Sequence, residues 1–178
     1  FFHTGAYDAN RTFYRSMSCS IDILISSNLE RLLYEITGRD PAAVRGFMDG
    51  LRREGAYAIP EAARAELEQY FYADCCDEQD TLATIRRTWE RQGYLMDPHT
   101  AVAQTIYERY LERTGDRTHT VALSTASPFK FCTDVLSAFE TPDPDDFVNA
   151  LRLSERTGAE IPPQIGEQRA HRRVEQIV

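Results

Sequence analysis

The sequence predicts a mostly α-helical chain with one or few strands, of the kind that completes an α/β domain whose other strands lie elsewhere. Apolar residues recur at helical spacing along most of the 178 residues, and glycines punctuate the resulting segments. Only residues 118–124 form a β-branched, apolar run bounded by turn residues. A single strand cannot build a parallel sheet, so we expect this strand to require partners from outside the chain.

The first half of the chain predicts four consecutive helices. Ile25 to Ile36 keeps a helical stripe, with Ser20 or Asp22 as a possible cap and Gly38 after it. The next helix begins at Asp40-Pro41, where an N-cap residue precedes a proline at the first helical position. Two more helices follow, one from about Pro60 to Phe71 and one from Leu82 to Gly93.

The second half predicts a helix, the strand and two further helices. Asp97-Pro98 begins a helix that ends at Gly115, where a left-handed C-terminal residue is expected. After the strand, Ser127-Pro128 begins a helix that reaches about Phe139. The last helix covers residues 145–156, and residues 159–178 are predicted to form a loose, polar tail.

Composition excludes several classes of function. The net charge is -8, and the only short basic cluster is Arg169, Arg172 and Arg173, so nucleic acid is not a predicted partner. No apolar run approaches the roughly 20 residues that span a membrane. The four cysteines lack the spacing of a zinc site or a disulfide framework, so no metal is predicted and the thiols indicate a reduced, cytoplasmic protein.

Ser124 and Thr125 are the first candidates for a binding site. They follow the predicted strand and precede a predicted helix, which is where ligands bind in open α/β sheets. A hydroxyl is also the group that suits a neutral pyridine nitrogen, whereas a carboxylate would protonate the ring. The alternative is structural: in it, the two residues serve only as a polar turn and helix cap after a buried strand.

A second group of candidates lies near the N-terminal end and at one helix start. Ser16, Ser18 and Ser20 alternate before a helix and offer hydroxyls and free backbone N–H groups to an anion. His99 is expected in the first turn of its helix, close to the positive end of the helix dipole, where it could exchange a proton with a ligand. The alternatives are a capped helix start and a surface histidine.

Four segments in this order carry a resemblance to a known family. They are GAYDANR at 5–11, SIDILISSNLERLL at 20–33, DPHTA at 97–101 and LSTASPFKF at 123–131. Together they resemble threonine synthase of the bacterial and fungal type, and the similarity runs from Phe1 to about Gly158. The resemblance implies the C-terminal part of the large pyridoxal-phosphate-binding domain of a tryptophan-synthase-like fold, with residues 40–93 as a helical insertion.

The resemblance also implies a reaction and a cofactor. Threonine synthase converts O-phospho-L-homoserine and water to L-threonine and phosphate with pyridoxal phosphate, so it is a carbon–oxygen lyase. In this family the Schiff-base lysine and the glycine-rich phosphate loop precede the matched region. The chain, whose only lysine is Lys130, is therefore expected to hold no catalytic residue and to need the N-terminal part of the same enzyme as its partner.

Residue roles follow from the matched positions. Thr125, with Ser124 beside it, is implied as the partner of the pyridine nitrogen. The wall of the active site is implied to include further polar residues, which are Ser16, Ser18, Ser20, Asp22, Asn28, Arg31 and, more weakly matched, His99.

Two other functions stay open. The chain could be a non-catalytic helical binding protein derived from such an enzyme, or part of a related pyridoxal-phosphate lyase with another substrate. Because Phe1 begins the chain inside the matched pattern, we expect a fragment, and we expect its unpaired strand edge to favour self-association.

Overall fold

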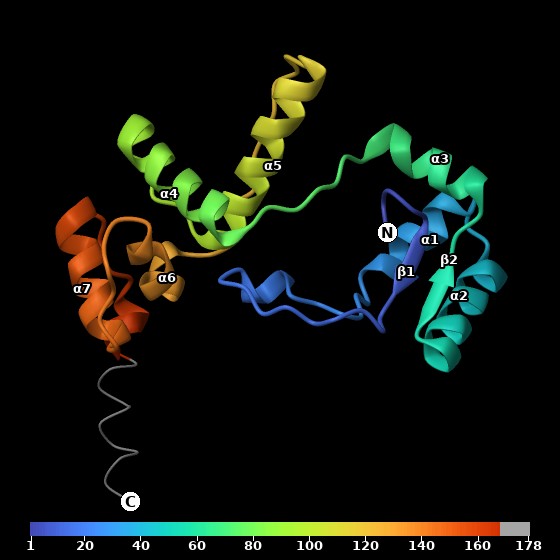
Figure 1. Cartoon of the computed structure of the whole chain (residues 1–178), viewed down its shortest axis with the longest axis horizontal. Helices are drawn as coiled ribbons and strands as arrows, with labels where there is room; N and C mark the ends of the chain where they lie inside the picture. Colours follow the sequence, from blue (N-terminus) through green and yellow to red (C-terminus); the bar gives the residue numbers. More distant parts are fainter. Residues whose placement is uncertain (168–178) are drawn as a thin grey trace, which may run out of the picture. The chain divides into compact units, whose positions relative to one another are not determined.

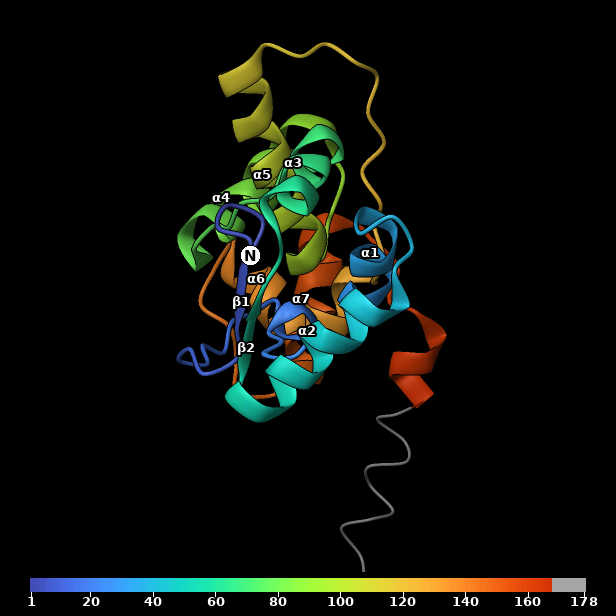
Figure 2. The ribbon, with the colours of Figure 1, turned by 90° about the vertical axis from the view of Figure 1, so that its right-hand side faces the viewer.

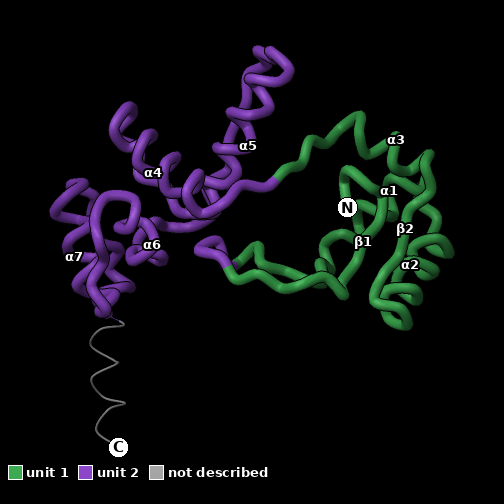
Figure 3. Tube along the Cα trace, viewed as in Figure 1, with its two compact units in different colours: residues 1–15, 20–74 green, residues 16–19, 75–178 purple. Residues whose placement is uncertain are grey.

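The computed structural model describes residues 1–167, which separate into two compact units (Figure 1; Figure 3). Unit 1 comprises residues 1–15 and 20–74, and unit 2 comprises residues 16–19 and 75 onward. Helices dominate both units, which confirms the prediction of a mostly α-helical chain with few strands. Among the described residues, no helix combines the length and apolar character needed to cross a membrane.

Unit 1 packs three helices against a short β-ladder. Strands β1 (Ala6–Asp8) and β2 (Ala56–Ala58) pair antiparallel, with Tyr7 opposite Tyr57. The two tyrosine rings stack at a centroid distance of 5.2 Å, and burial raises the pKa of Tyr57. Sequence reasoning missed both strands because segments of three residues carry no measurable alternation.

The helices of unit 1 are α1 (Leu29–Ile36), α2 (Pro41–Glu54) and α3 (Glu61–Tyr70). Their core consists of buried apolar residues, namely Leu33, Ile59, Ala63 and Leu67. The predicted start of α1 near Ile25 is wrong: Ile25 is exposed, and neither Ser20 nor Asp22 caps the helix, because residues 22–28 follow an irregular path. Gly55 ends α2 in a left-handed conformation, and a Cβ there would lie 2.4 Å from Asn10 Oδ1.

Unit 2 contains the α4–α5 pair and a second group of helices. Helices α4 (Glu78–Gln92) and α5 (Pro98–Thr114) both end at a left-handed glycine, a conformation that was predicted for Gly115, whereas Gly93 was predicted only as the helix end. The predicted helix from Ser127 is divided into a 3-10 helix, η2 (Pro128–Phe131), and α6 (Cys132–Ser137). Helix α7 (Asp146–Thr157) follows.

One apolar cluster holds the helices of unit 2 together. It includes Ile85 of α4, Phe129 of η2, Leu136 of α6 and Leu153 of α7, each at most 4% exposed. Ala159, Ile161 and Ile165 also pack against it, so the prediction of a loose tail is wrong for these residues, because their apolar side chains gain burial there. The remainder of the predicted tail, residues 168–178, lies outside the described residues.

The predicted strand at 118–124 is also wrong. Residues 115–126 leave α5 and return without helix or strand, as Figure 2 shows. Val121 and Leu123 are 74% and 78% exposed, although a buried strand was expected. The physical reason is that, among the described residues, no neighbouring strand offers backbone groups to this segment.

Candidate functional site

The candidate site begins with Asp97, a fully buried carboxylate at the start of α5. Asp97 is the N-cap residue, and Pro98 occupies the first helical position, so the local sequence fixes both the helix start and the carboxylate. Its Oδ1 accepts the backbone N–H of His99 at 3.0 Å and lies 2.9 Å from His99 Nδ1. The positive end of the helix dipole favours a negative charge at this point.

Thr100 links this carboxylate to the predicted cofactor-binding turn. Its hydroxyl donates to Asp97 Oδ2, and its Oγ1 lies 3.2 Å from Ser124 Oγ. Ser124 is 24 residues further along the chain, so the contact ties the start of α5 to the end of the irregular segment 115–126. Thr125, the next residue, is exposed.

The other side of the turn is held by η2. Ser127 Oγ accepts the backbone N–H of Phe129 at 3.3 Å, and the Phe129 side chain is buried in the apolar cluster. The His99 ring lies 4.7 Å from the ring of Phe131, so His99, only 10% exposed, contacts η2 as well as Asp97. The hydroxyls at 124 and 125 therefore lie between two anchored segments.

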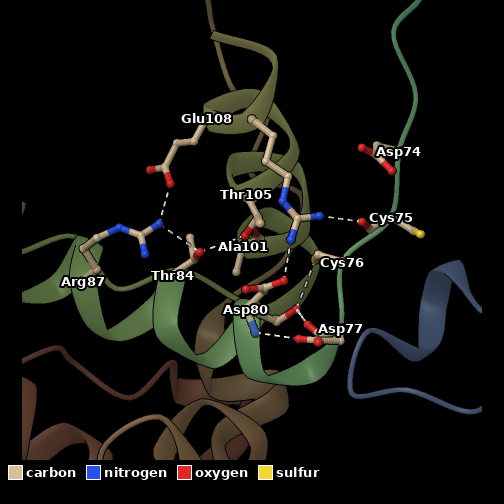
Figure 4. Close-up of polar contacts among 12 residues, drawn as sticks. Asp74, Cys75, Cys76, Asp77, Asp80, Thr84, Arg87, Ala101, Thr105 and Glu108 are labelled. Carbon is tan, nitrogen blue, oxygen red and sulfur yellow. Dashed lines mark hydrogen bonds and ion pairs between the residues drawn. The ribbon is translucent and has the colours of Figure 1, made fainter. Parts of the chain in front are cut away.

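Helix α5 is fixed by polar contacts to α4, which Figure 4 shows. Thr84 and Thr105 hydroxyls lie 2.8 Å apart in the buried interface. Arg87 pairs with Glu108, and Arg109 pairs with Asp80 while donating to the Cys75 carbonyl oxygen at 2.8 Å. These contacts restrain the helix that carries Asp97, His99 and Thr100.

Asp116 anchors the beginning of segment 115–126. Its Oδ1 accepts from the Thr118 hydroxyl at 2.6 Å and from the Thr118 N–H at 2.9 Å, and its Oδ2 accepts from the Tyr110 hydroxyl at 2.8 Å. These hydrogen bonds, with those of Thr118 the largest, lower the pKa of the Asp116 carboxyl to about 2. Both ends of the segment are thus tied to α5, and its middle is not.

The remaining predicted site residues are distributed over both units. Ser16 and Ser18 belong to unit 2: Ser16 Oγ accepts the Ser18 N–H at 3.1 Å, and the Ser18 side chain is buried. Ser18 Oγ has no hydrogen-bond partner among the described residues. Ser20, Asp22, Asn28 and Arg31 belong to unit 1, where Asn28 Oδ1 accepts from the Arg31 guanidinium at 2.8 Å.

The structure therefore joins His99 to Ser124 through Asp97 and Thr100, and joins Asn28 to Arg31. Sequence reasoning treated Asp97 as a helix cap only and did not single out Thr100. The signal was present in the segment 97–101, because an aspartate cap has one carboxylate oxygen left to accept from a hydroxyl at the third helical position.

The region that contains this site is similar to a known protein family. The family model described as "Threonine synthase, C-terminal" matches residues 100–167. Threonine synthase-like 1 of Homo sapiens is 36% identical over 141 residues, which are 79% of this chain and 19% of that protein. The threonine synthase of Eremothecium gossypii is 31% identical over 165 residues, covering 85% of this chain and 32% of that protein.

Two solved structures have the same fold. The X-ray structure of pyridoxal-phosphate-bound threonine synthase from Brucella melitensis matches with a TM-score of 0.67 and 34% identity, covering 85% of this chain and 32% of that chain. Yeast threonine synthase matches with a TM-score of 0.73 and 27% identity, covering 87% of this chain and 34% of that chain. The fold is therefore that of the helical C-terminal part of threonine synthases.

The comparisons support a threonine synthase-like C-terminal fragment, as the sequence segments predicted. It spans between about a fifth and a third of the length of these relatives.

Proposed function

We propose that this chain is the C-terminal part of a threonine synthase, which converts O-phospho-L-homoserine and water to L-threonine and phosphate with pyridoxal phosphate. The observation that carries the proposal is the Ser124-Thr125 turn, held to the buried Asp97 through Thr100, inside the region that the family model matches. The similarity to a pyridoxal-phosphate-bound threonine synthase supports the cofactor.

The turn suits the pyridine nitrogen of the cofactor. Its hydroxyls are neutral, and their positions are set by anchored segments on both sides. When bound, the cofactor would withdraw electrons from the substrate, and a neutral hydrogen-bond partner would leave its ring nitrogen unprotonated. The chain's own contribution is to hold the ring in place and set the strength of that electron withdrawal.

We propose that the other predicted residues line the active site around the substrate. Ser18 has a buried hydroxyl without a partner among the described residues, which suits a polar atom supplied by a ligand. His99 and the polar residues Ser16, Ser20, Asp22, Asn28 and Arg31 complete the proposed wall.

The catalytic lysine and the phosphate loop are proposed to belong to the part of the enzyme that precedes the matched region. The partner of this chain is then the N-terminal part of the same protein. We place the enzyme in the cytoplasm, since its four cysteines are free thiols.

A second candidate is a family member that does not catalyse this reaction. It is favoured by one observation: threonine synthase-like 1, at 36% identity, matches more closely than the Eremothecium threonine synthase at 31%. Such a protein would be a non-catalytic binding protein or a lyase with another substrate.

The test is an assay of the intact protein with O-phosphohomoserine, in which phosphate and threonine are measured together. We expect both products in equal amounts, and neither with O-phosphoserine as the control substrate. Phosphate release without threonine would indicate a related lyase, and no reaction despite bound cofactor would indicate the non-catalytic candidate.

The chain alone provides a control. Incubated with pyridoxal phosphate and borohydride, it should give no specifically labelled residue, because Lys130 is proposed not to form the Schiff base. The Lys130 Nζ lies 5.4 Å from the centre of the Phe131 ring, a position that a structural cation can occupy. Stoichiometric labelling of Lys130, absent in Lys130→Arg, would contradict the assignment.

A further inference from the structure

Unit 2 contains a cavity that is distinct from the proposed cofactor turn. Its volume is about 430 Å³. Small-molecule sites have volumes of roughly 300–1000 Å³, so the cavity is large enough to hold such a ligand. The end of α4, the start of η2 and the end of α7 meet around it, and all three belong to unit 2 (Figure 3). Ser124 and Thr125 are not among the residues that line it, so a ligand bound there would be distinct from the cofactor.

Part of the cavity wall is aromatic and apolar. Trp89 lines the cavity from the last turn of α4, and Leu95, Pro128 and Phe129 add apolar surface. The Trp89 side chain is partly buried and also packs against the apolar cluster of unit 2, which restrains its ring. This part of the wall suits a ligand with an apolar body.

The other lining groups are electronegative. Helices α4 and α7 both end at the cavity, at Gly93 and Gly158. The last carbonyl groups of a helix have no partner within it and form the negative end of its dipole. Glu160, which is exposed, adds a carboxylate. The cavity thus combines the negative ends of two helices with a negative side chain.

Among the described residues that line the cavity, none carries a positive charge that would offset these groups. Arg156, in the last turn of α7, pairs with Glu140 at 3.5 Å and lies over the Phe139 ring at 5.1 Å, so its charge is directed elsewhere. Arg91, in the last turn of α4, is exposed and does not line the cavity. The electrostatics of the cavity therefore favour a cation from outside and disfavour an anion.

We propose that this cavity binds a small organic ammonium ion with apolar substituents. The helix ends and Glu160 attract its charge, and the Trp89 ring binds it by a cation–π interaction, for which tryptophan is the best aromatic side chain. A neutral ligand of the same shape gains the apolar contacts alone, and a carboxylate is repelled. The inference does not rest on the proposed function, because it concerns other residues and another ligand.

The test compares choline with two controls of similar shape. In 3,3-dimethylbutan-1-ol a carbon replaces the ammonium nitrogen, and 3,3-dimethylbutanoate carries a negative charge. Trp89 is the only tryptophan, so its indole N–H gives a single NMR resonance of the full chain that reports on the cavity. We expect choline to shift this resonance saturably and to bind roughly tenfold more tightly than the alcohol. The carboxylate should not shift it.

Two exposed glutamates separate local attraction from general charge. Glu160→Gln should weaken choline binding about twofold to fivefold, as for other exposed charge pairs, and should leave binding of the alcohol unchanged. Glu155→Gln removes the same charge from an exposed position of α7 that does not line the cavity, and it should have no effect. The amide resonances of the same spectra show whether each variant is folded.

A third variant tests the aromatic ring. Trp89→Leu keeps an apolar side chain without a ring, so calorimetry should show that the preference for choline over the alcohol is lost. Should Trp89→Leu fail to fold, Trp89→Phe keeps a weaker ring face and should reduce this preference without removing it.

Three results would overturn the proposal. They are the absence of a saturable shift with choline, equal affinities for choline and the alcohol, and equal effects of Glu160→Gln and Glu155→Gln. Equal affinities would make the cavity an apolar site without a preference for charge, and equal effects of the two substitutions would assign the attraction to the net charge of the chain.

Discussion

The α4–α5 pair and the segment 115–126 that follows it show what determines whether an apolar side chain is buried in this protein. Ile85 in α4 is completely buried, whereas Val121 and Leu123 in the segment are 74% and 78% exposed. A helix satisfies its own backbone groups and needs only one packed face, but an extended segment needs a neighbouring strand before burial becomes favourable. Equally apolar side chains therefore reach opposite environments within one unit.

The largest expected effect tests this contrast directly. Ile85→Ala should lower the free energy of unfolding of unit 2 by about 2–5 kcal/mol, because a fully buried side chain is lost and a cavity remains. Val121→Ala should change it by less than about 0.5 kcal/mol, as for other exposed positions.

Urea unfolding followed by the fluorescence of Trp89, which packs against the cluster of unit 2, measures both changes. Similar losses for the two variants would mean that the segment is buried in solution, and the contrast would be lost.

The second effect concerns association. If the exposed segment makes the chain associate with itself, replacing one apolar side chain should weaken the complex by roughly tenfold, since burying such a side chain contributes about 1.5–3 kcal/mol. Leu123→Lys is the variant, and Thr120→Lys adds the same charge at an exposed polar position of the same segment. Sedimentation of the chain and of both variants would measure the strength of this association. A monomer at high concentration would contradict the prediction of self-association.

The third effect lies within the α4–α5 interface. Thr105→Val removes one of the two partners of the buried Thr84 hydroxyl, leaving only the Arg87 guanidinium, and should cost about 1–2 kcal/mol, because a buried hydroxyl that loses a hydrogen bond is unfavourable. Thr84→Val together with Thr105→Val should cost less than the sum of the single changes, since both single changes remove the same Thr84–Thr105 hydrogen bond. Additive losses in urea unfolding would show that the two hydroxyls do not depend on each other.

The sequence predicted the helices of the pair and of its neighbours well, because their ends are set locally. Three aspartates predicted as N-caps or helix starts accept backbone N–H groups in the structure: Asp40, Asp97 and Asp145. Gly115 after α5 adopts the left-handed conformation that was expected, and Gly93 follows the end of α4 as predicted. Each of these features depends on residues within four positions of one another.

The failed predictions depended on distant partners. The strand at 118–124 has the composition of a strand, yet the described residues contain no strand beside it. The same holds for the site: the Thr100–Ser124 contact joins residues 24 positions apart, and local patterns cannot specify it. The placement of the serines and of His99 near a bound substrate remains a prediction that the structure does not test.

The smallest effect concerns the one local anchor of the exposed segment. The pKa of Asp116 is lowered from 3.8 to about 2, first by the hydrogen bonds of Thr118 and then by that of Tyr110. A lowered folded pKa means that these hydrogen bonds are fully present above about pH 4 and are lost as the pH falls toward about 2. The Thr118 amide resonance should move over this range in NMR spectra, and Thr118→Val should raise the midpoint because it removes the strongest donor. Asp116→Asn should abolish the transition, whereas a transition that persists in this variant would assign it to another carboxyl. Loss of this turn through Asp116→Asn at neutral pH should leave the α4–α5 pair intact, because the contacts between these two helices do not involve Asp116.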